Sequence, residues 1–192
     1  IHKVADVLNP LVMVGLTDKL SISNIIGRNA FKMVRTSRHP VMTIRGRQNR
    51  SEYKTILLPL DLAKESREKV DKAVELAKRF NSTIRVISVL TQTDEEAENK
   101  LLAYSNQVWK YIRSHNIRTT VRTMRGSNPA QLILEYGRQI DADLILIMSK
   151  EVGNVKEFFT GTVAEHVINE SEIPVLTYHP IERKDTTVFL PY

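Results

Sequence analysis

The segment Leu144-Ile145-Leu146-Ile147-Met148 is an apolar run that leads through a polar loop to a second apolar run at Ile173–Tyr178. The same pattern stands near the start of the chain, where Leu11-Val12-Met13-Val14-Gly15 leads to the run at Val41–Arg45. Identical residue types recur at matched positions in the two copies: Gly27 and Gly161, Ala30 and Ala164, Ser37 and Ser171, Pro40 and Pro174, Val41 and Val175, Thr43 and Thr177. Because their register is constant, we infer a duplicated structural unit.

Strand-like and helix-like segments alternate between the copies. Apolar runs predict strands over 55–60, 84–90, 118–125, 144–148 and 173–178. Apolar residues at helical spacing predict helices over 65–80, 94–115, 129–140 and 161–170, with Trp109 in the core. Strands separated by helices form parallel sheets through right-handed crossovers. We therefore predict an α/β fold, a five-stranded parallel sheet with helices on both faces.

The repeat predicts the domain organisation. Residues 1–46 are interpreted as the C-terminal fragment of a first module, 47–52 as a linker, 53–180 as a complete second module and 181–192 as a tail. A strand at 11–15, a helix at 27–37 and a strand at 41–45 are too few to bury a sheet alone. We expect that an upstream portion of this module is missing, or that these elements pack against the second module or against a neighbouring chain. The apolar tail is expected to dock as an edge strand or to be disordered.

Composition excludes several classes of protein. The 192 residues are 42% hydrophobic and include no cysteine, which excludes disulfides, thiolate metal sites and cysteine nucleophiles. No apolar run reaches the roughly 18 residues of a membrane span, so a cytoplasmic protein without membrane contact is expected. The five histidines are scattered, and no metal-ligand spacing or nucleophile motif occurs. We predict no catalytic residues and no metal.

The net charge of +6 is concentrated near the start of the chain. Residues 1–50 contain nine basic and two acidic residues, whereas the remainder is nearly balanced. This distribution fits either a surface for anions or nucleic acid, or a solvated helix face and linker. No nucleic-acid-binding motif accompanies the charge, so the second interpretation is favoured. The basic residues that would form the surface are Arg35, Arg38, Arg45, Arg47 and Arg50.

Candidate ligand-binding residues follow the first and fourth strands of the second module. In an open parallel sheet, ligands bind beyond the carboxyl ends of the strands, where the strand order reverses. Asp61, after Pro59, could accept hydrogen bonds from an adenine amino group or a ribose hydroxyl, or could cap the next helix. Met148 and Ser149 end the fourth strand, and Gly161-Thr162 opens a helix as a phosphate cradle or as an ordinary N-cap.

Several motifs follow one another in a set order: the strand ending in Pro59-Leu60-Asp61, the helix opening at Asn128-Pro129, the run Ala142–Met148, Gly161-Thr162 and Ile173-Pro174-Val175-Leu176. In this order they resemble a universal stress protein domain. The resemblance covers 53–180 as a whole domain and about 4–45 as the end of another. It implies a flavodoxin-like fold of the adenine nucleotide alpha hydrolase-like type, dimerisation through the last strand, and ATP or AMP binding in one subclass.

The resemblance also implies roles for individual residues. Asp61 matches the adenine-recognising Asp, Val89 matches the position whose backbone meets the base, and Gly161 and Thr162 match the final phosphate-binding pair. The two loop glycines of the ATP-binding subclass fall on Met148 and Glu151, which argues against tight triphosphate binding. In the first copy, the counterparts are Gly15, Gly27 and Arg28.

The leading hypothesis is a non-enzymatic stress-response protein that acts by assembly and binding, with weak or absent nucleotide binding. The strands expected to pair, within the chain as a pseudo-dimer or between chains, contain Val41, Met42 and Thr43 and Val175, Leu176 and Thr177. One alternative is an ATP or AMP sensor with at most slow hydrolysis. A second is a basic adaptor for anions or RNA.

Overall fold

The computed structural model describes residues 11–16, 33–34, 36–37, 39–46, 52–61, 65–91, 95–148 and 163–179. The elements, in chain order, are β1 (Val12–Leu16), β2 (Val41–Arg45), β3 (Thr55–Leu60), α3 (Glu65–Phe80), β4 (Thr83–Leu90), α4 (Glu95–Ser114), β5 (Thr119–Arg125), α5 (Pro129–Gln139), β6 (Leu144–Met148), α6 (Val163–Glu170) and β7 (Val175–Tyr178). Every strand and helix predicted between 55 and 178 is present, with ends shifted by at most two residues.

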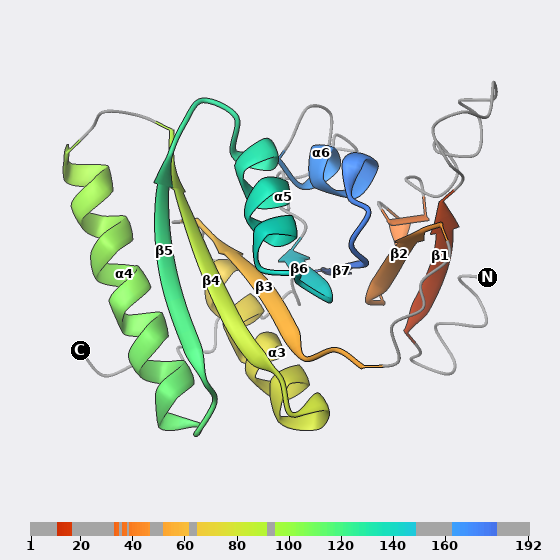
Figure 1. Cartoon of the computed structure of the whole chain (residues 1–192), viewed down its shortest axis with the longest axis horizontal. Helices are drawn as coiled ribbons and strands as arrows, with labels where there is room; N and C mark the ends of the chain where they lie inside the picture. The colour runs from red at the N-terminus through yellow and green to blue at the C-terminus, as the bar shows by residue number, and fades with distance from the viewer. Residues whose placement is uncertain are drawn as a thin grey trace.

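The strands form one seven-stranded sheet in the order β1-β2-β7-β6-β3-β4-β5. The five strands expected for the second module lie together in this order, and all their pairings are parallel. The expectation of a five-stranded sheet is corrected, because β1 and β2 add to its β7 edge (Figure 1). The strands of the first copy thus join the sheet of the second module within the same chain.

Both faces of the sheet are covered by helices, and each face has its own apolar cluster. The first cluster joins α3 and α4 to residues such as Ile56, Leu146 and Met42. The second joins α5 and α6 to residues such as Leu57 and Val41 on the opposite face. Neighbouring residues of a strand enter different clusters, as the two-residue period of a strand requires. Both clusters extend into β2, so the core does not stop at the edge of the second module.

The joint between the copies is the antiparallel pairing of β2 with β7. Met42 lies opposite Leu176, and this central pair is flanked by Val41 opposite Thr177 and Thr43 opposite Val175. Since Val41 matches Val175 and Thr43 matches Thr177 in the repeat, exchanging the copies leaves the pairing unchanged. The joint is therefore pseudo-twofold symmetric, like the contact in a twofold dimer.

The copies share the hydrogen bonds of the turn before each last strand. The Ser37 hydroxyl donates to the His39 carbonyl at 2.9 Å and accepts the His39 N–H at 3.1 Å. The Ser171 hydroxyl does the same with Ile173, at 2.6 and 3.1 Å. Each serine N–H closes the preceding helix at 3.0 Å, on Met33 and Val167. The repeat in sequence is thus a repeat in local structure.

Trp109 is a correction to the predicted core. Its side chain is 40% exposed, with the Arg113 guanidinium 5.9 Å from its ring centroid. The buried residues of α4 are Leu101, Ser105, Val108 and Ile112. Trp109 follows Val108 by one residue and is therefore rotated about 100° away from the buried stripe. A polar residue, Ser105, takes part in that stripe and hydrogen-bonds Ser88 at 2.7 Å.

Several expectations fall outside the described residues: the tail, most of the linker and most of the predicted helix over 27–37. Within the described ranges, no helix has the length and hydropathy of a membrane-spanning segment.

Candidate functional site

The strand order reverses between β3 and β6. From β3 the chain moves by crossovers to β4 and then β5 on one side, and it then returns to place β6 and β7 on the other. This is the topological switch point at which ligands bind beyond the carboxyl ends of parallel strands. The residues that end β3 and β6 therefore form the candidate site.

A proline ends the pairing of β3 with β6. The carbonyl of Thr55 accepts from the N–H of Asp143, just before β6, whereas the carbonyl of Lys54 accepts from Thr83 at the start of β4. Because a strand alternates its hydrogen-bonding side, Pro59 faces β6 and has no N–H to donate. The register between β3 and β6 stops at Leu57 and Ile145, although both strands run on. Their carboxyl ends are thus left without ladder bonds to one another.

The amino ends of the same two strands are tied together. The Thr55 N–H donates to the Asp143 carboxylate at 2.8 Å, and the Asp143 N–H donates back to the Thr55 carbonyl at 2.9 Å. Sequence reasoning gave Asp143 no role. Its place immediately before an apolar strand was the available signal.

The described candidates occupy the carboxyl end of the sheet. Asp61 directly follows β3 and is partly buried. Val89, near the end of β4, packs against the apolar cluster under α5. Met148 ends β6 opposite Tyr178 and is only 8% exposed, so its side chain is accommodated inside the protein. The structure therefore gathers Pro59, Asp61 and Met148 around one switch point.

Other candidates lie outside the described residues. In the second copy they are Ser149, Glu151, Gly161 and Thr162; in the first copy they are Gly27 and Arg28; in the basic strip they are Arg35, Arg38, Arg47 and Arg50. Gly15 is described near the end of β1, and a Cβ built there would meet no atom within 4 Å.

Two side chains at the ends of β2 and β7 reach across the joint in a reciprocal manner. Arg45 donates from Nη2 to the Asn169 carbonyl near the end of α6, at 2.7 Å. His179, its counterpart in the repeat, hydrogen-bonds the Val34 backbone in the helix before β2. Burial lowers the pKa of His179 to about 4, and the Val34 hydrogen bond opposes this shift without reversing it. Sequence reasoning missed this pair, although the two residues occupy matched positions at the end of the last strand of each copy.

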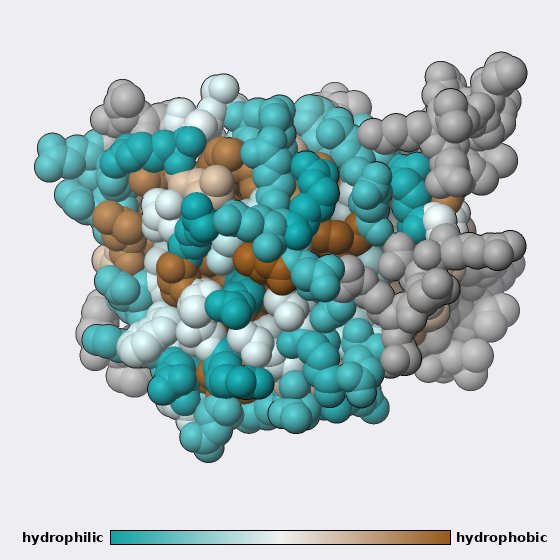
Figure 2. Space-filling model, in the orientation of Figure 1, coloured by the Kyte–Doolittle hydropathy of each residue, from teal (hydrophilic) through white to brown (hydrophobic). Residues whose placement is uncertain are grey.

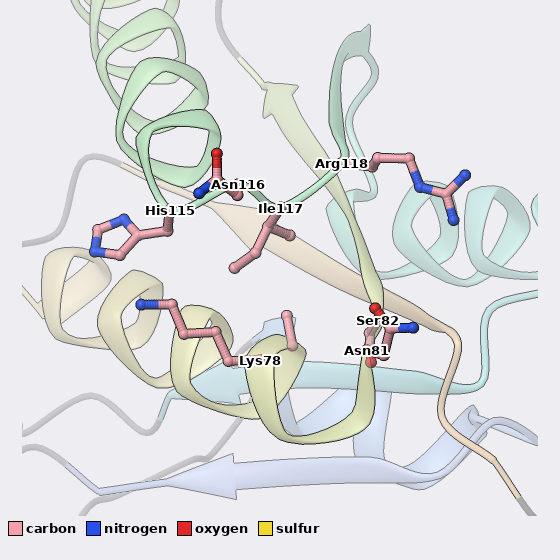
Figure 3. A pocket seen from close by; sticks show the side chains of 8 residues that line it. Lys78, Asn81, Ser82, His115, Asn116, Ile117 and Arg118 are labelled. Carbon is pink, nitrogen blue, oxygen red and sulfur yellow. The ribbon is translucent and has the colours of Figure 1, made fainter.

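A pocket of about 240 Å³ opens at the opposite end of the sheet (Figure 3). It lies where α3 and α4 end and β4 and β5 begin, and its polar lining includes Lys78, His115 and Asn116. It is therefore separate from the switch point. Among the described residues, no three His, Cys, Asp or Glu side chains group as a metal site.

Comparison with known proteins identifies the family of this fold. The model of the universal stress protein family matches residues 52–179. A putative universal stress protein of Staphylococcus saprophyticus is 26% identical over 137 residues, which cover 65% of this chain and 82% of that protein.

Solved structures show the same fold. A universal stress protein from Archaeoglobus fulgidus matches with a TM-score of 0.70 and 19% identity, over 88% of this chain and 61% of its own. The chain thus spans about three fifths of that longer protein. A structure of the universal stress protein from the same organism in complex with dAMP matches with a TM-score of 0.53 and 18% identity, over 65% and 97% of the two chains. The protein described here belongs to the universal stress protein family.

Proposed function

We propose that this universal stress protein acts without catalysis, as a stress-response binding and assembly protein whose two related modules are joined along their last strands. The observation that carries the proposal is the symmetric joint of β2 and β7, with Met42 opposite Leu176 at its centre. Such a contact has the form of a dimer interface, but both halves belong to one chain. The last strand of the second module is therefore occupied inside the molecule.

The match to the longer Archaeoglobus structure supports the tandem organisation. That match includes 88% of this chain, whereas residues 52–179 make up only two thirds of it. The part of this chain that matches the Archaeoglobus structure therefore extends beyond the second module. The shared serine turns and the parallel β1–β2 and β6–β7 pairings support the same interpretation.

The joint is tested by Met42→Glu, with Met13→Glu as the matched control. The two methionines are neighbours in register on one face of the sheet, but Met42 is 5% exposed and Met13 is 60% exposed. A carboxylate at 42 would be buried in the joint, at a large cost in free energy, whereas one at 13 would stay in water.

We expect Met42→Glu to remove hydrogen-exchange protection from the amides of β1 and β2 while β3, β4 and β5 keep theirs. The sedimentation coefficient should fall as the first copy detaches. Met13→Glu should change neither quantity. Equal protection of β2 in both variants would contradict a joint that holds the copies together.

The second candidate function is an adenine nucleotide sensor with at most slow hydrolysis. It is supported by the position of Asp61 at the switch point, by the loss of ladder bonds after Leu57, and by the dAMP in one related structure. A carboxylate at this edge can accept hydrogen bonds from an adenine amino group or a ribose hydroxyl. In this proposal Asp61 recognises the nucleoside and Val89 lies beside the base.

Calorimetry with AMP and with ATP, each with and without magnesium, tests the sensor. A nucleotide site predicts measurable heat at millimolar ligand, and a loss of at least tenfold in affinity for Asp61→Ala. Glu95→Ala, an exposed carboxylate at the start of α4, is the control and should bind as the parent does. The absence of heat in the parent protein would eliminate this function and leave the assembly proposal standing.

A further inference from the structure

The amino-terminal halves of β4 and β5 carry an uncovered face on the α5 side of the sheet. Toward the carboxyl ends, Val89 and Met124 pack against the cluster beneath α5. Nearer the amino ends of the same strands, Thr120 and Arg122 are exposed and Arg85 is partly exposed. Figure 2 shows hydrophilic and weakly polar side chains over much of this view of the molecule, with apolar areas between them. The helix layer therefore leaves part of this face open.

Three arginines surround one threonine on this face. Arg85 lies opposite Thr120 in the parallel register, and its Nη1 donates to the Thr120 hydroxyl at 3.0 Å. Arg118 and Arg122 stand two positions before and after Thr120, which places all three on the same side of β5. Two residues along a strand cover about 6.6 Å and neighbouring strands are about 4.8 Å apart, so each arginine originates within about 7 Å of Thr120, while Arg118 and Arg122 are about 13 Å apart along the strand. Arg118 points away from Lys78 and His115 (Figure 3).

Within the described ranges, no ion pair involves Arg85, Arg118 or Arg122. The ion pairs found among the described residues involve Lys54, Lys72, Lys100 and Arg125. Glu135 in α5 accepts a hydrogen bond from Gln131, and Asp143 before β6 accepts one from Thr55. Residues 51–192 contain nearly equal numbers of acidic and basic residues, so the arginine cluster is a local feature.

Protection of an exposed strand edge accounts for only part of this arrangement. Charged residues on an edge strand discourage pairing with other chains, and β5 is an edge strand. Arg85, however, belongs to β4, which is paired on both sides. Arg85 lies opposite Thr120 in the interior of the sheet, so edge protection does not account for its position.

One of the arginines lies beside an aromatic ring. The Arg122 guanidinium lies 5.3 Å from the ring centroid of Tyr136, a buried residue of α5. This distance is within the range of a cation–π contact, and the forked N–H groups of a guanidinium match the geometry of phosphate oxygens. Arg85 is oriented in turn by Thr120.

We propose that Arg85, Arg118 and Arg122 form a binding surface for phosphate groups, carried either by a free phosphorylated compound or by the backbone of a single-stranded nucleic acid. This surface lies toward the amino ends of β4 and β5, away from the switch point, and does not depend on the nucleotide proposal. Binding should be electrostatic and should weaken as salt rises.

The test compares two probes, inorganic pyrophosphate and a fluorescently labelled uridine 20-mer, across a series of salt concentrations. The variant carries Arg85→Gln, Arg118→Gln and Arg122→Gln together. The matched control carries Arg79→Gln, Lys110→Gln and Arg113→Gln on exposed positions of α3 and α4, so both proteins lose the same charge. Thermal unfolding of each variant checks the fold, and Arg118→Gln alone, ahead of the β5 ladder, provides a variant with minimal effect on the sheet.

We expect the triple variant to lose at least tenfold in affinity for the probe that binds, and the control less than about twofold. With the 20-mer, loss of three phosphate contacts should reduce the slope of log affinity against log salt by about 2. Binding of pyrophosphate would identify a small phosphorylated ligand, and binding of the 20-mer alone would identify a nucleic acid. Equal losses in the variant and the control, or no binding of either probe at low salt, would overturn the proposal.

Discussion

The two copies of the repeated unit have the same turn but different surroundings. In the second copy, β6 lies between β7 and β3, and all five of its residues are buried. In the first copy, β1 lies at the end of the sheet, and its residues alternate between exposed and partly buried. The local pattern thus determines strand and turn in both places, while burial depends on the neighbouring strand and helix.

The largest effect should come from truncating matched residues of these strands. Leu146 is fully buried, and its counterpart Met13 is 60% exposed. Leu146→Ala should lower the free energy of unfolding by about 2–5 kcal/mol, because it leaves a cavity between α3 and the sheet. Met13→Ala should cost less than about 1 kcal/mol. Urea unfolding measures both, and similar losses would show that β1 is as buried as β6.

The reciprocal contacts across the joint should respond differently to pH. The pKa of His179 in the folded state, about 4, lies below its unfolded value near 6.5. The stability that depends on the neutral side chain is therefore fully present above pH 6.5. As pH falls from 6.5 to 4, the unfolded chain binds a proton that the folded protein excludes, and stability falls by up to about 3 kcal/mol.

Chemical unfolding between pH 7.5 and 4 measures this loss. His179→Gln should flatten the dependence over that interval, whereas Arg45→Gln, at the matched position, should leave its shape unchanged. An unaltered curve for His179→Gln would show that this histidine is not the titrating group.

Added methyl groups should distinguish the tightly packed surroundings of Gly137 from the open surroundings of Gly15. A Cβ at Gly137 would lie 2.9 Å from Ile173 Cδ1 and 3.2 Å from Leu57 Cδ2, whereas one at Gly15 would meet nothing within 4 Å. Overpacking at Gly137 should cost about 1–3 kcal/mol, partly offset by about 1 kcal/mol of helix propensity. Gly15→Ala should be neutral or slightly stabilising in thermal unfolding. A stabilised Gly137→Ala variant would mean that α5 can move away from β3.

The smallest effect should be shared by both copies. Ser37→Ala and Ser171→Ala each remove a buried hydroxyl that donates to a carbonyl and accepts an N–H two residues later. Each should cost about 1 kcal/mol, as for a typical hydrogen bond. Urea unfolding measures the free energy of unfolding of both variants. A decrease confined to Ser171→Ala would show that only the second turn contributes to global stability.

The sequence predicted the elements of the second module, because continuous apolar runs such as Leu144–Met148 distinguish buried strands from amphipathic helices. It also predicted which residues end β3 and β6. It did not predict the exposure of Trp109, since a helix of 20 residues with several apolar positions leaves the buried face ambiguous within about one residue.

Other features depend on register between distant strands. The orientation of Pro59 toward β6 and the position of Arg85 opposite Thr120 follow from pairings that no local pattern specifies. The pairing of β2 with β7, by contrast, was expected from the repeated strands.

The antiparallel joint has a consequence for the direction in which the two copies face. Because β1 and β2 run opposite to β7, their carboxyl ends emerge at the rim where β3 to β7 begin. The end of β1 near Gly15 and the end of β3 near Asp61 are therefore on opposite rims of a single sheet. A molecule bound beyond β1 would therefore face away from one bound beyond β3.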